Sequence, residues 1–210
     1  ERDAARVRVF GLPQFNALGQ FGEGALQTPY GLWVHETAPD EVEVFVTDSY
    51  PLDAAVPARA SPDRRIKRFR VRLDEEPVRG FELDAFGETA PESALRWVES
   101  ISGDAVYDRL VIAEEHPEHR RHGPLIYRLD GKFSGERLGE GLFLGEPEGI
   151  ALYECQSGNG YWIAADQSRE DNRFHVFDRA TLAHLGSFRG ETVSNTDGIV
   201  LHPGASPRFP

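Results

Sequence analysis

The feature that most restricts the fold of this chain is a short motif that returns at a fixed interval. A polar residue, a small residue and an aliphatic residue follow one another at four places, which are Tyr30-Gly31-Leu32, Glu99-Ser100-Ile101, Glu148-Gly149-Ile150 and Asp197-Gly198-Ile199. The last three copies are 49 residues apart, and the longer first gap contains a polar, Pro-bearing insertion at 51–65. A period near 50 residues in a chain rich in strands is typical of the blades of a β-propeller.

Between these motifs the chain repeats a series of strand-like segments. Alternating or β-branched runs predict strands at 6–10, 41–48, 109–115, 160–166 and 173–179. Helical periodicity is scarce. We therefore predict an all-β fold, a single partial β-propeller domain over residues 1–210 with about four to five blades and an insertion loop at 51–65. Because the last copy of the motif is followed by only one strand's length of chain, we expect part of a closed ring.

The charge balance limits the partners of such a domain. Lys and Arg number 23 and Asp and Glu number 35, which gives a net charge of −12. This surplus argues against unaided binding to nucleic acid or anionic lipid and favours metal cations. No run of apolar residues is long enough for a membrane helix, and a chain without Met is expected to be a processed product or a piece of a longer reading frame. The single Cys155 leaves the redox compartment open.

The repeat predicts where the acidic side chains gather. The innermost strand of each propeller blade lines the central channel, so Glu99, Glu148 and Asp197 would stand at equivalent places around it. The second strand returns antiparallel and would bring Glu115 and Gln167 to the same mouth of the channel. Clustered carboxylates repel one another and recruit a cation, and oxygen ligands of this kind suit Ca²⁺. The alternative is turn chemistry, with the acids in solvent.

Other polar groups are interpreted as structural or left open. Strand alternation turns Glu114 away from Glu115, and the basic run at 64–72 is expected on a solvated face. The basic cluster after Glu115 admits a phosphate clamp, a transition-metal site or a solvated loop. It contains His116, His119, Arg120, Arg121 and His122.

These residues carry a resemblance to a known family. The stretch EPEGIALYECQSGNGYWIAADQS, then FHVFDR and SNTDGI, resembles the β-propeller phytases, the calcium-dependent alkaline 3-phytases of bacilli and other bacteria. LVIAEE at 110–115 and the Tyr30-Gly31 pair are similar to further family motifs. The resemblance covers about residues 28–210 and is specific from 146 onward. It implies a six-bladed ring of which this chain is roughly the last two-thirds, so that the remaining blades are its partner.

The resemblance also implies roles for individual residues. The calcium ligands it implies are Glu99, Glu115, Glu148, Glu191 and Asp197. Tyr30, Gln167 and Glu146 fall where the family contacts substrate or bound water, and Glu148, Asp197 and Gln167 form the implied catalytic set. Ser49 stands about where the family has a phosphate-binding Lys, which is a departure.

The expected function follows from both arguments. We expect a calcium-dependent phosphomonoester hydrolase that acts on phytate, myo-inositol hexakisphosphate, through a metal-activated water. The resemblance implies a secreted or periplasmic location. Two alternatives stay open, a non-catalytic propeller that serves as a binding platform and a propeller of the sugar-lactone hydrolase type.

Overall fold

The computed structural model describes residues 1–49, 62–116, 120–155, 157–201 and 204. Three four-stranded antiparallel sheets follow one another along the chain. The first comprises β3 (Pro29–Ala38), β4 (Glu41–Asp48), β5 (Ile66–Arg72) and β6 (Arg79–Phe86). The second comprises β7 (Val98–Asp104), β8 (Arg109–Glu114), β9 (Leu125–Tyr127) and β10 (Phe133–Arg137). The third comprises β11 (Glu146–Glu154), β12 (Gly160–Gln167), β13 (Arg173–Asp178) and β14 (His184–Phe188).

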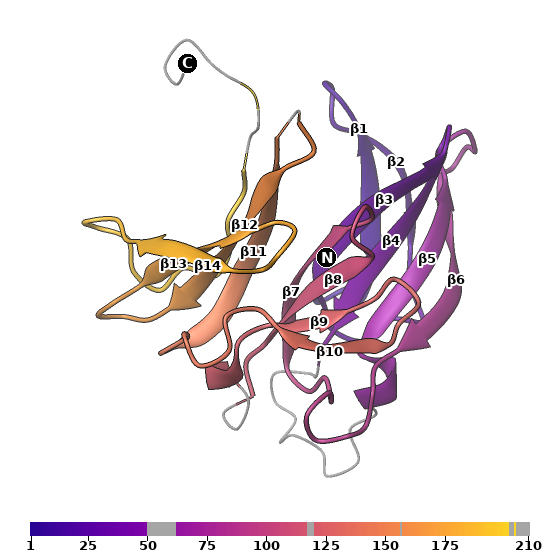
Figure 1. The fold of residues 1–210 in the computed structure, drawn as a ribbon. Coiled ribbons are helices and arrows are strands. Elements are labelled where there is room, and N and C mark those ends of the chain that lie inside the picture. The colour runs from indigo at the N-terminus through magenta and orange to yellow at the C-terminus, as the bar shows by residue number, and fades with distance from the viewer. Residues whose placement is uncertain (50–61, 117–119, 156, 202–203, 205–210) are drawn as a thin grey trace.

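A two-stranded sheet precedes these three. It pairs β1 (Val7–Gly11) with β2 (Asn16–Phe21), and short 3₁₀ turns lie at Pro62–Arg64 and Arg120–His122. In Figure 1 the sheets succeed one another from β3–β6 on the right to β11–β14 on the left, with β7–β10 between them. The all-β, propeller-type prediction is confirmed. The count of four to five blades is reached only by including partial ones, since the described residues form three complete sheets and one pair of strands.

The predicted strands lie close to the observed ones because alternation and β-branching are local signals. The run at 41–48 coincides with β4, and those at 109–115, 160–166 and 173–179 differ from β8, β12 and β13 by one residue. The hairpin between β11 and β12 turns at Gly158, whose φ is 83°. The insertion at 51–65 falls mostly outside the described residues.

Apolar side chains fill the spaces between successive sheets. β1–β2 packs on the first sheet around Phe21, Phe69 and Val71, and Leu110 and Tyr127 lie in the core between the first and second sheets. The core between the second and third sheets contains fully buried Trp162. Such face-to-face packing leaves the first strands β3, β7 and β11 as neighbours, with β7 between the other two. No helix among the described residues has the length and apolar character needed to cross a membrane.

The second strand of each sheet ends in a buried acid. Asp48 Oδ1 accepts the backbone N–H groups of Gln27 and Thr28 over 2.8 and 2.7 Å. Glu114 accepts those of Trp97 and His116, both over 2.9 Å, and of Arg96. Asp166 accepts those of Leu144 and Gly145 over 3.0 and 2.7 Å. Each acid therefore ties the segment before the first strand to the second strand, and the structural role predicted for Glu114 agrees with its contacts.

The third strand places a different side chain beside each of these acids. Lys67 Nζ lies 3.6 Å from Asp48 Oδ2, and His175 Nε2 lies 3.4 Å from Asp166 Oδ2. In the second sheet the equivalent position on the third strand is Leu125, which carries no charge. Burial raises the pKa of Glu114. His175 also meets Ser187 Oγ at 2.7 Å. Because Lys67 fills the same place in the first sheet, we interpret the Asp166–His175–Ser187 series as structural.

The basic run differs from its prediction at two positions. Arg68 and Arg72 form surface ion pairs, as expected of a solvated face. Arg65 and Lys67, however, are buried, at 4% and 5% exposure. Arg65 donates to the carbonyl of Asp48 over 2.7 Å, and Lys67 donates to that of Ala25 over 2.8 Å. Both charged groups lie in the interior and bind backbone carbonyls there, because alternate residues along this part of the chain face the interior.

Candidate functional site

The candidate site is built around three β-bulges at equivalent positions of the three sheets. The pairing of first and second strands shifts between Pro29 and Leu32, between Val98 and Ile101, and between Pro147 and Ile150. Each bulge contains the polar residue of the repeated motif, Tyr30, Glu99 or Glu148. A bulge re-aims a side chain away from the regular alternation. We call Tyr30, Glu99, Glu115, Glu148, Gln167 and Asp197 the rim, because they lie at the start of the first strands or the end of the second strands, or in the following segment.

The structure brings the carboxylates of Glu99, Glu115 and Glu148 near one another, and the negative charge of Glu115 acts on both of the others. Burial, followed by the charge of Glu115, raises the pKa of Glu99 to about 8. Burial and the contact with Glu115 also raise the pKa of Glu148, with Glu99 and Asp197 adding to the effect. The rim is thus a place where acidic oxygens are held together against their repulsion.

Two carboxylate oxygens of the rim have no hydrogen-bond partner among the described residues. Oε2 of Glu99 and Oε2 of Glu148 are buried and accept no hydrogen bond. A buried carboxylate oxygen without a donor is costly, and a divalent ion satisfies it. The pairwise contacts place Glu115 between the other two. Within the described part of the chain, no group of three His, Cys, Asp or Glu side chains is arranged so that it could hold a metal ion. The oxygen ligands are of the type that calcium prefers, but the arrangement of the described residues does not form a metal site, and the calcium site stays a prediction.

Tyr30 and Arg2 lie beside the rim carboxylates. Burial, followed by the nearby charge of Glu99, raises the pKa of Tyr30. The guanidinium carbon of Arg2 lies 5.6 Å from the centre of the Tyr30 ring, and its charge lowers the pKa of Glu99 against the larger raising effects. Sequence reasoning missed Arg2, because it precedes β1 and reaches the rim only through the packing of β1–β2 on the first sheet.

Asp197 joins the rim from a segment outside the strands. Gln167 Nε2 donates to Asp197 Oδ1, and Gln167 pairs in turn with Glu146 at the start of β11. A side chain at Gly149 would come within 2.6 Å of the backbone N of Ile199, so the segment after Asp197 runs closely along β11. The structure therefore brings together Gln167, Glu148 and Asp197, which the repeat placed at one mouth of the channel, and sets Glu146 opposite Gln167 in the sheet.

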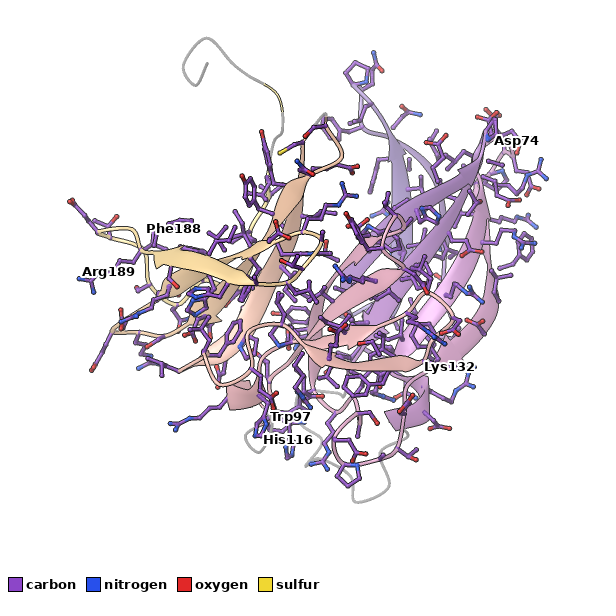
Figure 2. All side chains as sticks on the ribbon, in the orientation of Figure 1. Asp74, Trp97, His116, Lys132, Phe188 and Arg189 are labelled. Atoms are coloured by element: carbon purple, nitrogen blue, oxygen red, sulfur yellow. The ribbon has the colours of Figure 1, made fainter. Side chains whose placement is uncertain are left out.

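Glu191 follows the last strand of the third sheet. It is exposed and lines a pocket of about 560 Å³ together with Arg189 and Asp171. Figure 2 shows Arg189 at the outer tip of the third sheet, well away from Trp97 and His116, which adjoin Glu99 and Glu115 in the sequence. No contact described for Glu191 reaches the rim carboxylates. Its role as a calcium ligand stays a prediction.

The structure also describes the surroundings of Ser49 and of His116 in the basic cluster. Ser49 is 8% exposed and its carbonyl accepts a hydrogen bond from buried Arg65 over 3.1 Å. His116 packs edge-on against Trp97 with ring centres 5.3 Å apart, and the Nη1 atom of Arg96 lies 3.5 Å from its Nδ1. His119 lies outside the described residues, so the use of the basic cluster stays open.

The channel wall continues from the rim between the first strands. A pocket of about 510 Å³ follows β3, β7 and β11 and is lined near the rim by Ile101 and Ile150. Its opposite end is polar, with Asp104, Glu154 and Arg179. The rim thus lies at the end of this pocket that Ile101 and Ile150 line, opposite the end with Asp104, Glu154 and Arg179.

Comparison with known proteins supports the fold. No protein-family model matches the chain, and no curated protein matches it. The chain is similar in structure to a putative exo-beta-1,3-galactanase from Bifidobacterium bifidum s17, with a TM-score of 0.53 and 12% identity. The match covers 86% of this chain but only 59% of the galactanase chain. That similarity shows a β-propeller-type fold.

Weaker similarities involve two other structures. An exo-beta-1,3-galactanase from Clostridium thermocellum, 1,3Gal43A, matches with a TM-score of 0.47 and 12% identity, over 87% of this chain and 40% of that one. A nidogen/laminin complex matches with a TM-score of 0.38 and 14% identity, over 94% of this chain and 80% of that one.

Proposed function

We propose that the protein is a calcium-dependent phosphomonoester hydrolase that acts on phytate. The observation that carries the proposal is the contact of Glu99, Glu115 and Glu148 at one end of the channel, with a buried, unpartnered oxygen on two of them. The resemblance of residues 146–210 to the β-propeller phytases supports the choice of substrate. A protein with a net charge of −12 also needs bridging cations to approach a polyanion.

The rim residues divide into two roles under this proposal. Glu99, Glu115, Glu148 and Asp197 would hold calcium, and the resemblance adds Glu191. When bound, calcium would supply positive charge against the substrate phosphates and lower the pKa of a water molecule. Gln167 orients Asp197 through its amide N–H and presents its remaining polar atoms toward substrate or water.

Substrate contacts come from the other side of the rim. Arg2 supplies a permanent positive charge beside the Tyr30 ring, where a phosphate oxygen can accept its N–H groups. A pocket of about 320 Å³ lies next to this pair and is lined by Arg8, Pro29 and Tyr30. Glu146 at the start of β11 would contact water or substrate at the opposite side.

Phosphate release tests this function. We expect release of inorganic phosphate from calcium phytate, its loss on exhaustive treatment with EGTA, and its recovery when calcium is restored. Glu148→Gln should lower the rate by at least about 100-fold, whereas Glu136→Gln, on exposed strand β10, should leave it unchanged. Release that persists in EGTA would exclude the calcium-dependent mechanism.

A second candidate function needs no metal. A carboxyl group with a pKa of about 8 is protonated at neutral pH, and beside a second carboxylate it is suited to act as a general acid in glycoside hydrolysis. Glu99 beside Glu115 meets that description, and the Bifidobacterium protein of similar fold is described as a galactanase. Release of galactose from β-1,3-galactan in the presence of EGTA, lost in Glu99→Gln, would favour this function over phosphate hydrolysis.

A further inference from the structure

A buried ion pair joins the second and third sheets at the end of the channel opposite to the rim. Arg179 follows β13 and donates to both carboxylate oxygens of Asp104, from Nε over 2.6 Å and from Nη2 over 2.8 Å. The two side chains are 2% and 1% exposed. A bidentate pair of this kind fixes both the distance and the relative angle of its two groups.

The same guanidinium also holds the far end of β11. Its Nη1 donates to the carbonyl of Gly158 over 2.9 Å and lies 3.0 Å from Glu154 Oε1. Glu154 is the last residue of β11, and Asp104 is the last residue of β7. Arg179 therefore links the far ends of two neighbouring inner strands, with atoms of both in direct contact.

The opposite ends of these strands carry the rim. Glu99 is the second residue of β7 and Glu148 is the third of β11. About five to six residues of extended chain, or roughly 17–20 Å, separate each of them from the linked ends. Between these ends β7 and β11 lie side by side, and the apolar side chains of Ile101 and Ile150 line the pocket that follows them. Apolar packing resists separation but tolerates small shifts, whereas a bidentate ion pair does not.

We propose that the Arg179–Asp104 pair is a positioning device that sets the separation of Glu99 and Glu148 at the rim. Arg179 acts through the strands, since it lies at their other end. The consequence for calcium affinity rests on the proposed function, but the control of the separation does not. A break in the pair lets β7 and β11 shift against each other and moves the two carboxylates apart.

Spin labels test the separation without any metal. Glu99→Cys and Glu148→Cys carry nitroxides in a Cys155→Ser background, and the dipolar broadening of the continuous-wave EPR spectrum reports the distance between them. We expect Asp104→Asn and Arg179→Lys to reduce this broadening at a temperature well below unfolding. Asp104→Asn keeps the size of the side chain and one acceptor oxygen, so it is the milder variant if Arg179→Lys fails to fold.

Arg109→Gln is the matched control. Arg109 also joins the two sheets, by donating to the carbonyls of Arg179 and Ala180 over 2.7 and 2.8 Å. Its backbone lies opposite Asp104 in the β7–β8 pair, but no described contact joins the Asp104 carboxylate to the Arg109 guanidinium. Its loss should lower the Tm and leave the broadening unchanged. An Asp104→Arg, Arg179→Asp double variant should recover part of the broadening.

Calcium titration of the unlabelled protein separates this inference from the proposed function. Asp104→Asn should weaken calcium binding by roughly tenfold, as is usual for groups that support metal ligands, and Arg109→Gln should not. If the unaltered protein binds no calcium while the labels respond to Asp104→Asn, the proposed function fails and the positioning role holds. Unchanged broadening in Asp104→Asn, or unchanged affinity in a protein that binds calcium, overturns the positioning role.

Discussion

Glu99 and Glu148 occupy surroundings that favour their protonated forms. Burial is the largest cause, and the neighbouring carboxylate of Glu115 adds to it. The pKa of Glu99 in the folded protein, about 8, lies above the value of 4.5 for an unperturbed glutamate. Between these values the folded state binds more protons than the unfolded state. The free energy of unfolding of the metal-free protein therefore falls as the pH rises through this range.

The fall in the free energy of unfolding with rising pH predicts how the Tm changes. In EGTA we expect the Tm to fall by several degrees between pH 5 and pH 8, because Glu99 and Glu148 resist ionisation. Calcium should stabilise the ionised forms, so its effect on the Tm should grow over the same range. Differential scanning calorimetry measures both. A calcium effect that is independent of pH would mean that ions bind away from these carboxylates.

A second prediction concerns the buried acid of the third sheet. Asp166→Asn removes the charge that holds the backbone N–H groups of Leu144 and Gly145 and faces His175. We expect a loss of about 2–3 kcal/mol in the free energy of unfolding. Asp74→Asn, at an exposed ion pair with Arg72, should leave the free energy of unfolding almost unchanged. Urea unfolding of both variants checks this, and equal losses would contradict a structural role for Asp166.

At this scale the sequence distinguished Glu114 from Glu115, because alternation on a strand is a local rule. It did not reveal Arg2 beside Tyr30, since that contact depends on how β1–β2 packs on the next sheet. It also did not reveal the pairing of Arg179 with Asp104, whose residues are 75 positions apart. Nothing in their local patterns differs from that of an ordinary surface charge.

At the scale of elements, the three bulges turn the polar residue of each motif in a direction that the alternation of a regular strand does not allow. Each bulge interrupts the alternation at the polar residue of the motif. Thr47 Oγ1 links the first two bulges, because it accepts the backbone N–H of Gly31 over 2.7 Å and donates to the carbonyl of Glu99 over 2.6 Å. The small residue that follows the polar one allows neighbouring strands to approach. The sequence predicted the motif and its interval, but it predicted turns or strand starts rather than bulges.

Gly149 tests the close approach. Gly149→Ala would place a methyl group 2.6 Å from the backbone N of Ile199 and push the segment after Asp197 away from β11. We expect a loss of about 1–3 kcal/mol in the free energy of unfolding. Gly186→Ala on β14 has open space around the new methyl group and should change stability by less than about 0.5 kcal/mol. Urea unfolding compares the two, and equal stability would show that the segment does not pack as described.

At the scale of the whole molecule, the period of 49 residues predicted the architecture correctly, because each blade buries its faces only against its neighbours. The three interfaces use equivalent strands, so the residues of one repeat predict the place of those in the next. The repeat therefore predicted that Glu99, Glu148 and Asp197 lie at one end of the channel. The number of complete blades was harder to predict, since a partial blade has the same local signals as a whole one.

The central claim is that the rim binds a divalent cation through carboxylates from successive repeats. Isothermal titration of calcium into the EGTA-treated protein at pH 8, beside Glu148→Gln and Glu136→Gln, tests it most directly. The account predicts saturable binding in the unaltered protein and in Glu136→Gln, and binding at least about tenfold weaker in Glu148→Gln. Equal calcium binding by all three proteins, or none by the unaltered protein, would contradict it.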